Sequence, residues 1–214
     1  MTRKHSCLIA MIFPFLACLI YFNILDGMAF APVIYLAAKI FLLAFPLFFI
    51  KSLAPIKSVF KFDFGAFVRG STVGVLIFAT GYLVLNLPFI WDIVKSAAPH
   101  ITSKINSFGV MHHYLAMALG ISFVHSMLEE YYWRWFVYGI SGKNILSAVT
   151  FSLHHFIVLN YYFNILVALA LTTLVALGGI IFNFLYAKEK NIWGAWAAHV
   201  GADLFIFYTG GLLI

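Results

Sequence analysis

The chain contains a succession of apolar runs of about 20 residues, and these runs decide its structural class. Hydrophobic residues make up 64% of the 214 residues and charged residues only 9%, and the mean hydropathy is +1.02. An α-helix of about 20 apolar residues is long enough to cross the hydrocarbon core of a bilayer. Because lipid offers no hydrogen-bond partners to the backbone, such runs must be helical. The sequence therefore predicts an all-α, polytopic membrane helix bundle.

The positions of the apolar runs predict seven transmembrane helices. The predicted spans are Cys7–Leu25, Phe30–Ile50, Phe67–Trp91, Val110–Ile140, Ile145–Leu159, Phe163–Ala187 and Ile192–Leu213. Residues 92–108 are too polar to cross, and we expect them to form an amphipathic helix in the membrane interface. Because little sequence remains between the spans, we expect a single integral membrane domain over residues 1–214.

Lysine and arginine residues gather in alternate loops of this predicted topology. One side of the membrane receives Arg3, Lys4, Lys51, Lys57, Lys61, Arg69, Lys143, Lys188 and Lys190, and the other receives Lys95 and Lys104. The positive-inside rule then predicts a cytoplasmic N-terminus and a C-terminus outside. From the small size of the chain we expect a prokaryotic cell membrane. We attribute the net charge of +6 to this orientation and to contact with anionic lipid headgroups, and we expect no nucleic-acid partner.

Two adjacent glutamates interrupt the fourth predicted span. Glu129 and Glu130 lie inside the largely apolar stretch Met117–Tyr138, and Arg134 follows one turn later. A charged side chain near the centre of a bilayer costs about 2.5–3.5 kcal/mol on insertion scales. Residues retained at this cost indicate a functional site. The alternative is a structural glutamate pair that Arg134 neutralises.

Counting along the predicted helices places a glutamate and two histidines at one depth. Glu129 lies 12 residues before the turn Ser141–Asn144, His155 lies 11 residues after that turn, and His199 lies 9 residues after Lys190. At 1.5 Å per residue, these side chains would all lie roughly 14–18 Å from the predicted cytoplasmic ends. The sequence thus predicts one layer in which three helices bring a carboxylate and two imidazoles together.

The spacing within two of these helices predicts side-chain pairs. Glu130 and Arg134 are four residues apart, as are His199 and Asp203, so each pair shares a helix face. In such a layer a glutamate can take a proton from water, one histidine can orient that water, and the other can stabilise an oxyanion. The combination predicts hydrolysis by direct attack of water. A covalent mechanism through Ser126 is the less favoured alternative.

Three short motifs also resemble those of a known family. They are Glu129-Glu130-x-x-x-Arg134, Phe151-x-x-x-His155 and His199-x-x-x-Asp203. In this order, and each on an apolar helix, they resemble the motifs of the CPBP family (CAAX protease and bacteriocin-processing, also called ABI). The resemblance covers about Met117–Phe207 and implies a catalytic core over residues 109–210.

The resemblance implies a glutamic-type intramembrane endopeptidase that cleaves a membrane-bound or lipidated protein or peptide. Glu129 would be the general base, helped by His155, and Glu130 with Arg134 would support the site. His199 and Asp203 would form the pair that stabilises the oxyanion. Prenyl proteases often carry Asn at the last position. Since an ionised aspartate donates no hydrogen bond, Asp203 is either protonated or serves only to orient His199.

We expect no cofactor. A zinc ion held by Glu129, His155 and His199 is an alternative that we do not favour, because the chain has no H-E-x-x-H helix. For His154 we expect a role in packing or in supporting the residues of the site, rather than catalysis. For Lys39 we expect either a hydrogen bond between helices or a place facing a lipid-accessible groove.

Three other functions are compatible with buried polar groups in such a chain. They are a proton-coupled membrane transporter, a haem protein, and a family member with an immunity or scaffolding role that cleaves nothing.

Overall fold

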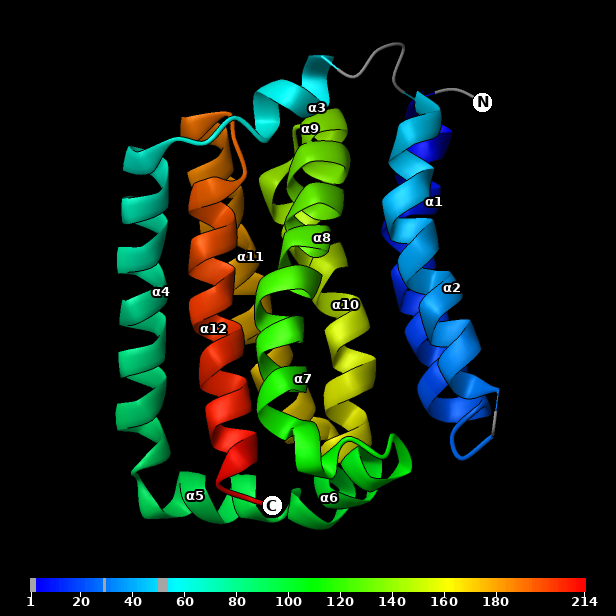
Figure 1. Cartoon of the computed structure of the whole chain (residues 1–214), viewed down its shortest axis with the longest axis vertical. Helices are drawn as coiled ribbons and strands as arrows, with labels where there is room; N and C mark the ends of the chain where they lie inside the picture. Colours follow the sequence, from blue (N-terminus) through cyan, green and yellow to red (C-terminus); the bar gives the residue numbers. More distant parts are fainter. Residues whose placement is uncertain (1–2, 29, 50–53) are drawn as a thin grey trace. The chain divides into compact units, whose positions relative to one another are not determined.

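Helices build the whole of the architecture. The computed structural model describes residues 3–28, 30–49 and 54–214 (Figure 1), and no β-strand occurs among them. The predicted all-α fold is confirmed.

The chain forms two compact units, and the first combines residues up to Lys61 with Leu128–Ile192. Its helices, in which η marks a 3₁₀- or π-helical segment, are α1 (Arg3–Leu19), η1 (Ile20–Ile24), α2 (Ala31–Ala44), η2 (Phe45–Phe49), α3 (Ala54–Val59), η5 (Tyr131–Tyr138), α9 (Gly139–Ser141), α10 (Asn144–Tyr162) and α11 (Ile165–Glu189). Within this unit α10 packs along both α11 and α1, and α1 lies beside α2 (Figure 1).

An aromatic segment holds η5 against the first two helices. The hydroxyl of Tyr132 donates to the carbonyl of Ala10 at 2.9 Å, and the hydroxyl of Tyr131 donates to the carbonyl of Leu43 at 3.1 Å. Trp133, the next residue, is fully buried. These contacts fix the rotation of η5 about its axis, and with it the directions in which the two preceding glutamates point.

The second unit combines Phe62–Met127 with Trp193–Ile214. It contains α4 (Phe64–Leu85), α5 (Pro88–Lys95), α6 (Ala98–Ser107), η3 (Met111–His113), α7 (Tyr114–Gly120), η4 (Ile121–His125) and α12 (Trp193–Gly211). One short helix, α8 (Ser126–Glu130), runs from the second unit into the first.

Glycines allow α4 and α12 to approach closely within the second unit. A Cβ atom on Gly70 would collide with the backbone of Gly194, and one on Gly201 would collide with the backbone of Gly74. Small residues at helix interfaces are typical of membrane proteins, where close backbone packing replaces the hydrophobic effect between helices. The glycine face therefore sets the position of α12, which carries His199 and Asp203.

The structure confirms helices long and apolar enough to cross a membrane, although not the predicted number. Among the described residues four helices qualify: His5–Ile24, Ala31–Phe49, Phe64–Leu85 and Ile165–Glu189. A fifth is counted if Pro88–Ser107 and Met111–Ser141, which meet at an angle of 95°, form one broken span. The helices α10 and α12 are long enough, at 19 residues each, but their polar residues lower their hydropathy. The prediction of seven spans is therefore not confirmed.

The predicted third span, Phe67–Trp91, is interrupted. Helix α4 ends at Leu85, and α5 begins at Pro88. Leu87 is extended, with φ −74° and ψ 124°, because a residue before proline is disfavoured in the α conformation.

The segment 92–108, predicted as one interfacial helix, is helical, but it belongs to two short helices, α5 and α6. Its place in the membrane interface stays a prediction.

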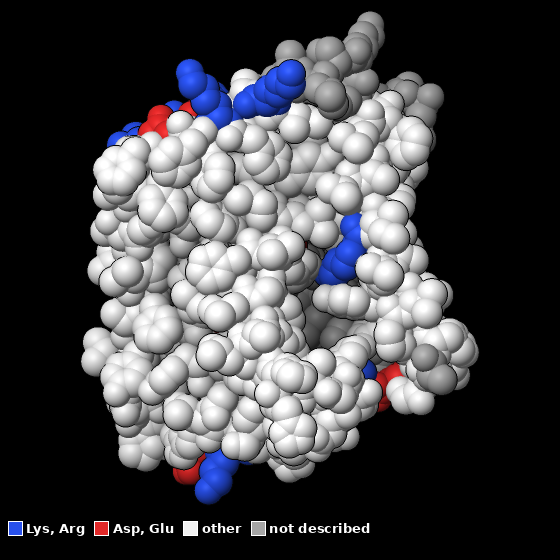
Figure 2. Space-filling model, viewed as in Figure 1, with Lys and Arg blue, Asp and Glu red and all other residues white. Residues whose placement is uncertain are grey.

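Most of the surface visible in Figure 2 is uncharged. Of the residues on which the predicted orientation depends, Lys51 lies outside the described residues, as do the side chains of Arg3 and Lys4. The orientation therefore stays a prediction.

Candidate active site

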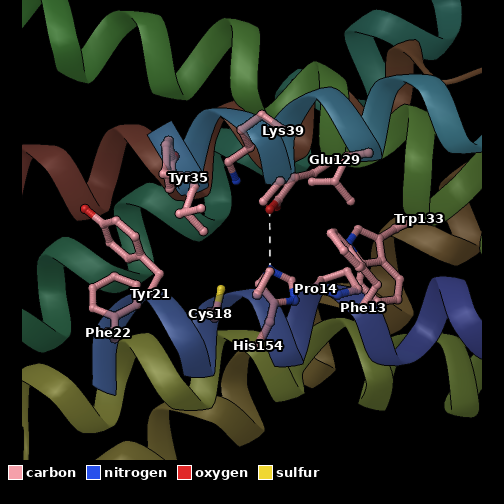
Figure 3. Close-up of a pocket in the computed structure, with 14 residues that line it drawn as sticks. Phe13, Pro14, Cys18, Tyr21, Phe22, Tyr35, Lys39, Glu129, Trp133 and His154 are labelled. Atoms are coloured by element: carbon pink, nitrogen blue, oxygen red, sulfur yellow. Dashed lines mark ion pairs between the residues drawn. The ribbon is translucent and has the colours of Figure 1, made fainter. Parts of the chain in front are cut away.

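Glu129 lies at the wall of a small pocket inside the first unit. The pocket has a volume of about 40 Å³ and is formed by α1, η1, α2, η5 and α10, together with Glu129 from α8. Figure 3 shows the side chains of Glu129, His154 and Lys39 extending into it. A polar cavity of roughly 10–15 Å³ already holds one water molecule. The pocket thus offers water a place beside a buried carboxylate.

His154 contacts Glu129 directly. Its Nε2 atom lies 3.4 Å from Glu129 Oε1, and both side chains are largely buried. The imidazole lies parallel to the indole of Trp133, with ring centroids 5.7 Å apart and an interplanar angle of 5°. Within the described part of the chain, His154 Nδ1 has no hydrogen-bond partner. Of the two roles expected for His154, packing alone does not describe its position, because this histidine contacts the glutamate.

His155 stands next to His154 on α10. Its Nδ1 atom lies 3.1 Å from the carbonyl oxygen of Phe151, so Nδ1 carries the proton and donates to that oxygen. The lone pair is then on Nε2, as in a histidine prepared to accept a proton or bind a metal. The centroids of the two imidazole rings are 4.1 Å apart. Both histidines therefore belong to the same polar cluster.

This cluster has the composition of a metal site. One ligand atom each from Glu129, His154 and His155 can be chosen so that all lie within 4.8 Å of one another. In a tetrahedral zinc site, bonds of 2.0–2.2 Å place the ligand atoms about 3.4 Å apart. The separation of 3.4 Å between His154 and Glu129 meets this spacing. In the part of the first unit that the structure describes, these three residues form the group that could hold a metal ion.

Glu130 points to a different partner, as the spacing predicts. Arg134 donates to its carboxylate from Nε at 2.9 Å and from Nη2 at 3.3 Å, and neither side chain is exposed. The guanidinium carbon also lies 4.5 Å from the ring centroid of Phe151. Arg134 itself is fully buried within the protein. The two adjacent glutamates thus have separate environments.

An amide network continues from this ion pair to the neighbouring helices. Arg134 Nη1 donates to Asn183 Oδ1 at 3.3 Å. The side-chain nitrogen of Asn183 donates to Asn144, to its carbonyl oxygen at 3.1 Å and to its Oδ1 at 2.9 Å. The network joins η5 to α11 and to the first residue of α10. It holds in place the helices that carry Glu129 and His154.

The predicted pair on α12 is also present, within the second unit. His199 Nε2 lies 3.6 Å from Asp203 Oδ1, and the two side chains are 6% and 16% exposed. The predicted layer that joins this pair to Glu129 and His155 stays a prediction. Ser126 is buried, and its hydroxyl donates to the backbone carbonyl of Ser122. That bond gives no support to Ser126 as a nucleophile.

Lys39 is the pocket residue for which the sequence left two roles open. It is the only charged residue in the apolar run Phe30–Ile50, and the structure places it in the pocket wall with Glu129 and His154. Its Nζ atom lies 4.8 Å from the ring centroid of Tyr35. This position does not decide between the two predicted roles, a hydrogen bond between helices and a place facing a lipid-accessible groove. An isolated charge in a long apolar run was the signal that marked it.

Comparison with known proteins gives one match. Residues 111–205 match the family model described as type II CAAX prenyl endopeptidase Rce1-like. The matched segment contains all three motifs, from Glu129 to Asp203, and leaves out α1 and α2. No curated protein and no solved structure matches the chain. Residues 111–205, under half of the chain, thus match the model of a CAAX-protease family, the group that the three motifs resemble.

Proposed function

We propose that the protein is an intramembrane endopeptidase that uses a water molecule activated by Glu129. The observation that carries this proposal is the 3.4 Å contact between His154 Nε2 and Glu129 Oε1 at the wall of a cavity of about 40 Å³. A carboxylate held by an imidazole, in a space that admits water but is otherwise apolar, is suited to general-base catalysis. The match of residues 111–205 to a family of endopeptidases supports a peptidase.

The proposed reaction has two steps. In the first, Glu129 takes a proton from water while the water oxygen attacks the carbonyl carbon of the scissile bond. In the second, the tetrahedral intermediate collapses, Glu129 gives this proton to the departing nitrogen, and the C–N bond breaks. His154 holds the carboxylate and shares its proton. General acid–base catalysis of this kind contributes about 10²–10⁴-fold to a rate.

The remaining motif residues have supporting roles in this proposal. The ion pair of Glu130 and Arg134 holds in position the helix that carries Glu129. The Nε2 atom of His155 is a second base in the cluster. By resemblance, His199 would stabilise the oxyanion. The 3.6 Å contact between His199 and Asp203 favours an Asp203 that orients the imidazole over one that donates to the oxyanion.

The substrate that we propose is a membrane-bound or lipidated polypeptide. The family description names CAAX prenyl endopeptidases, and a CAAX sequence is a C-terminal segment whose cysteine carries a prenyl group. A pocket among helices apolar enough to span a membrane is reached by a substrate that is itself held at the membrane. We propose cleavage of such an anchored peptide.

Cleavage of a lipidated fluorogenic peptide by purified protein in liposomes tests the proposal. Glu129→Gln should abolish cleavage while thermal unfolding stays at the wild-type temperature. Glu189→Gln, the same change at the last residue of α11, is the matched control and should cleave normally. Full activity of Glu129→Gln would remove Glu129 from the mechanism.

A further inference from the structure

Trp133 lies beside the histidine that contacts the proposed general base. Its indole is parallel to the imidazole of His154, with an interplanar angle of 5° and ring centroids 5.7 Å apart. Offset parallel packing of this kind is a favourable arrangement of two aromatic rings. Glu129 and Trp133 are four residues apart, and both line the pocket (Figure 3). One stretch of helix therefore supplies both the carboxylate and the indole that contact His154.

The orientation of the imidazole plane decides whether His154 and Glu129 can share a proton. The N–H bond or lone pair of an imidazole nitrogen lies in the plane of the ring, so the glutamate oxygen must lie close to that plane. A hydrogen bond weakens steeply when its angle falls below about 120°. The separation of 3.4 Å between Nε2 of His154 and Oε1 of Glu129 is already long for a hydrogen bond. A small tilt of the ring is therefore enough to break the contact.

The second ring nitrogen of His154 does not hold this plane. A histidine at a functional site is commonly oriented by a hydrogen bond through its second nitrogen. His155 follows this rule, because its Nδ1 atom donates to the carbonyl oxygen of Phe151 at 3.1 Å. For His154, no hydrogen bond from the described part of the chain reaches Nδ1. The plane of its imidazole is therefore set by the rings that pack against it.

Trp133 is the ring best placed to hold the imidazole plane. The rings of Phe151 and His155 meet the imidazole at 76° and 44°, so neither lies along it. The face of Phe151 also carries the Arg134 guanidinium, at 4.5 Å from the ring centroid. Trp133 lies flat along the imidazole and is itself fully buried in the core. A large flat ring that the core holds in place resists rotation of the imidazole about its Cβ–Cγ bond.

We infer that Trp133 is a positioning residue of the proposed reaction, which holds the imidazole of His154 in the plane that joins its Nε2 atom to Glu129. This inference rests on the proposed function, because Trp133 acts through the proton that Glu129 and His154 share. The indole itself takes no part in the chemistry. Loss of the flat ring should lower kcat and leave KM nearly unchanged, since a catalytic group misplaced by about 1 Å can cost about 10²-fold in rate.

Combined substitutions test whether Trp133 acts through His154. Trp133→Leu keeps an apolar side chain but removes the flat ring, and we expect kcat for a lipidated fluorogenic peptide in liposomes to fall about tenfold. In the His154→Gln protein the same substitution should cause no further fall, because the imidazole that it misplaces is absent. Two effects that multiply in the double variant would overturn the inference. A Trp133→Leu protein with the kcat of the wild type would overturn it as well.

Two further variants separate positioning from stability. Trp133→Phe keeps a smaller flat ring, so we expect kcat to fall only about threefold, and this fall should also vanish in the His154→Gln protein. If Trp133→Leu does not fold, Trp133→Phe carries the same test. Phe136→Leu is the matched control, because Phe136 belongs to the same buried core and packs against the rings of Phe45 and Phe49. It should lower the unfolding temperature and keep kcat. An equal fall of kcat in this control would overturn the inference.

Nuclear magnetic resonance tests the inference without cleavage. In detergent micelles, with ¹⁵N-labelled histidine, Glu129→Gln should shift the Nε2 resonance of His154, which is identified by its loss in His154→Gln. In the Trp133→Leu protein this shift should be absent, since the contact is broken, and a shift of the wild-type size would overturn the inference. If Glu129→Gln cleaves the peptide as well as the wild type, the proposed function fails. The resonance then still decides whether Trp133 positions His154.

Discussion

Arg134 contacts both oxygens of the Glu130 carboxylate, at 2.9 Å and 3.3 Å, where neither side chain is reached by solvent. Two parallel contacts between planar groups hold the relative orientation of the two side chains as well as their distance. Glu130 is therefore committed to structure. Its neighbour Glu129 contacts the imidazole of His154 at the pocket wall, and of the two glutamates it is the one that we propose as the general base.

Loss of Arg134 should destabilise the protein strongly. Arg134→Met leaves the Glu130 carboxylate buried without its guanidinium, and breaking one side of a buried pair costs about 3–5 kcal/mol. We expect a clearly lower unfolding temperature in detergent micelles, measured by circular dichroism. The double change Glu130→Met and Arg134→Met removes both charges and should recover much of the loss. An Arg134→Met protein as stable as the wild type would contradict the structural role of the pair.

Removal of the imidazole that meets Glu129 should slow the chemical step. In His154→Gln the glutamine side chain is polar and of similar length, but it cannot take up or release a proton. We therefore expect kcat to fall on the order of 100-fold, with little change in KM. His113→Gln, at an exposed histidine of the second unit, is the control. If the His154→Gln protein has the kcat and the unfolding temperature of the wild type, His154 has no part in the chemical step.

Bulk on the glycine face of α12 should separate it from α4. Gly201→Ala places a methyl group against the backbone of Gly74, and overpacking of this kind costs about 1–3 kcal/mol. We expect a lower unfolding temperature and, if His199 takes part in catalysis, a lower kcat. Gly178→Ala is the matched control, because the nearest atom to its added Cβ is Phe182 Cζ at 3.9 Å. Equal stability of the two variants would show that the helices adjust without cost.

Modification of Cys18 should inactivate the enzyme. Cys18 lines the pocket, whereas Cys7, the other cysteine, is buried elsewhere in the core at 8% exposure. Methyl methanethiosulfonate adds a methylthio group to a thiol, and at Cys18 that group would occupy the cavity. We expect activity to fall with time of treatment, and Cys18→Ser to resist the reagent. The Cys7→Ser protein should remain sensitive, and resistance of that variant would place the inactivating thiol at Cys7.

Chelation of metal ions should leave the activity unchanged. A metal ion would need the Nε2 atom of His154 as a ligand. This atom lies 3.4 Å from the Glu129 carboxylate, and in the proposed reaction it shares the proton of Glu129. Activity is measured after dialysis against 1,10-phenanthroline and again after zinc is added back. Loss of activity that zinc restores would assign metal-assisted hydrolysis to Glu129, His154 and His155.

The sequence predicted the features that depend on local spacing. The pairs Glu130–Arg134 and His199–Asp203 follow from the four-residue repeat of a helix, and both are present. The end of α4 was predicted too late, at Trp91 and not Leu85. Proline at position 88 was visible in the sequence, but the apolar residues on either side of it hid the break.

The choice between His154 and His155 was beyond sequence reasoning, for a physical reason. Adjacent residues on a helix point about 100° apart, and only the packing of α10 against its neighbours decides which of them meets Glu129. The same holds for Lys39, whose place at the pocket depends on how α2 packs within the first unit. Motif spacing identifies the helices of the site, and tertiary packing selects the side chains.

Two π-helical segments flank the short helix that carries the glutamates, η4 over Ile121–His125 and η5 over Tyr131–Tyr138. A π-helix closes each hydrogen bond over one residue more than an α-helix does. A homologue with one residue fewer in η5 can therefore form α-helical hydrogen bonds over the same stretch, while the side chains before and after it keep their directions. In a sequence alignment such a homologue has a gap of one residue in η5. Its site can still be intact, although the glutamate motif and the histidine of α10 are then one residue closer in sequence.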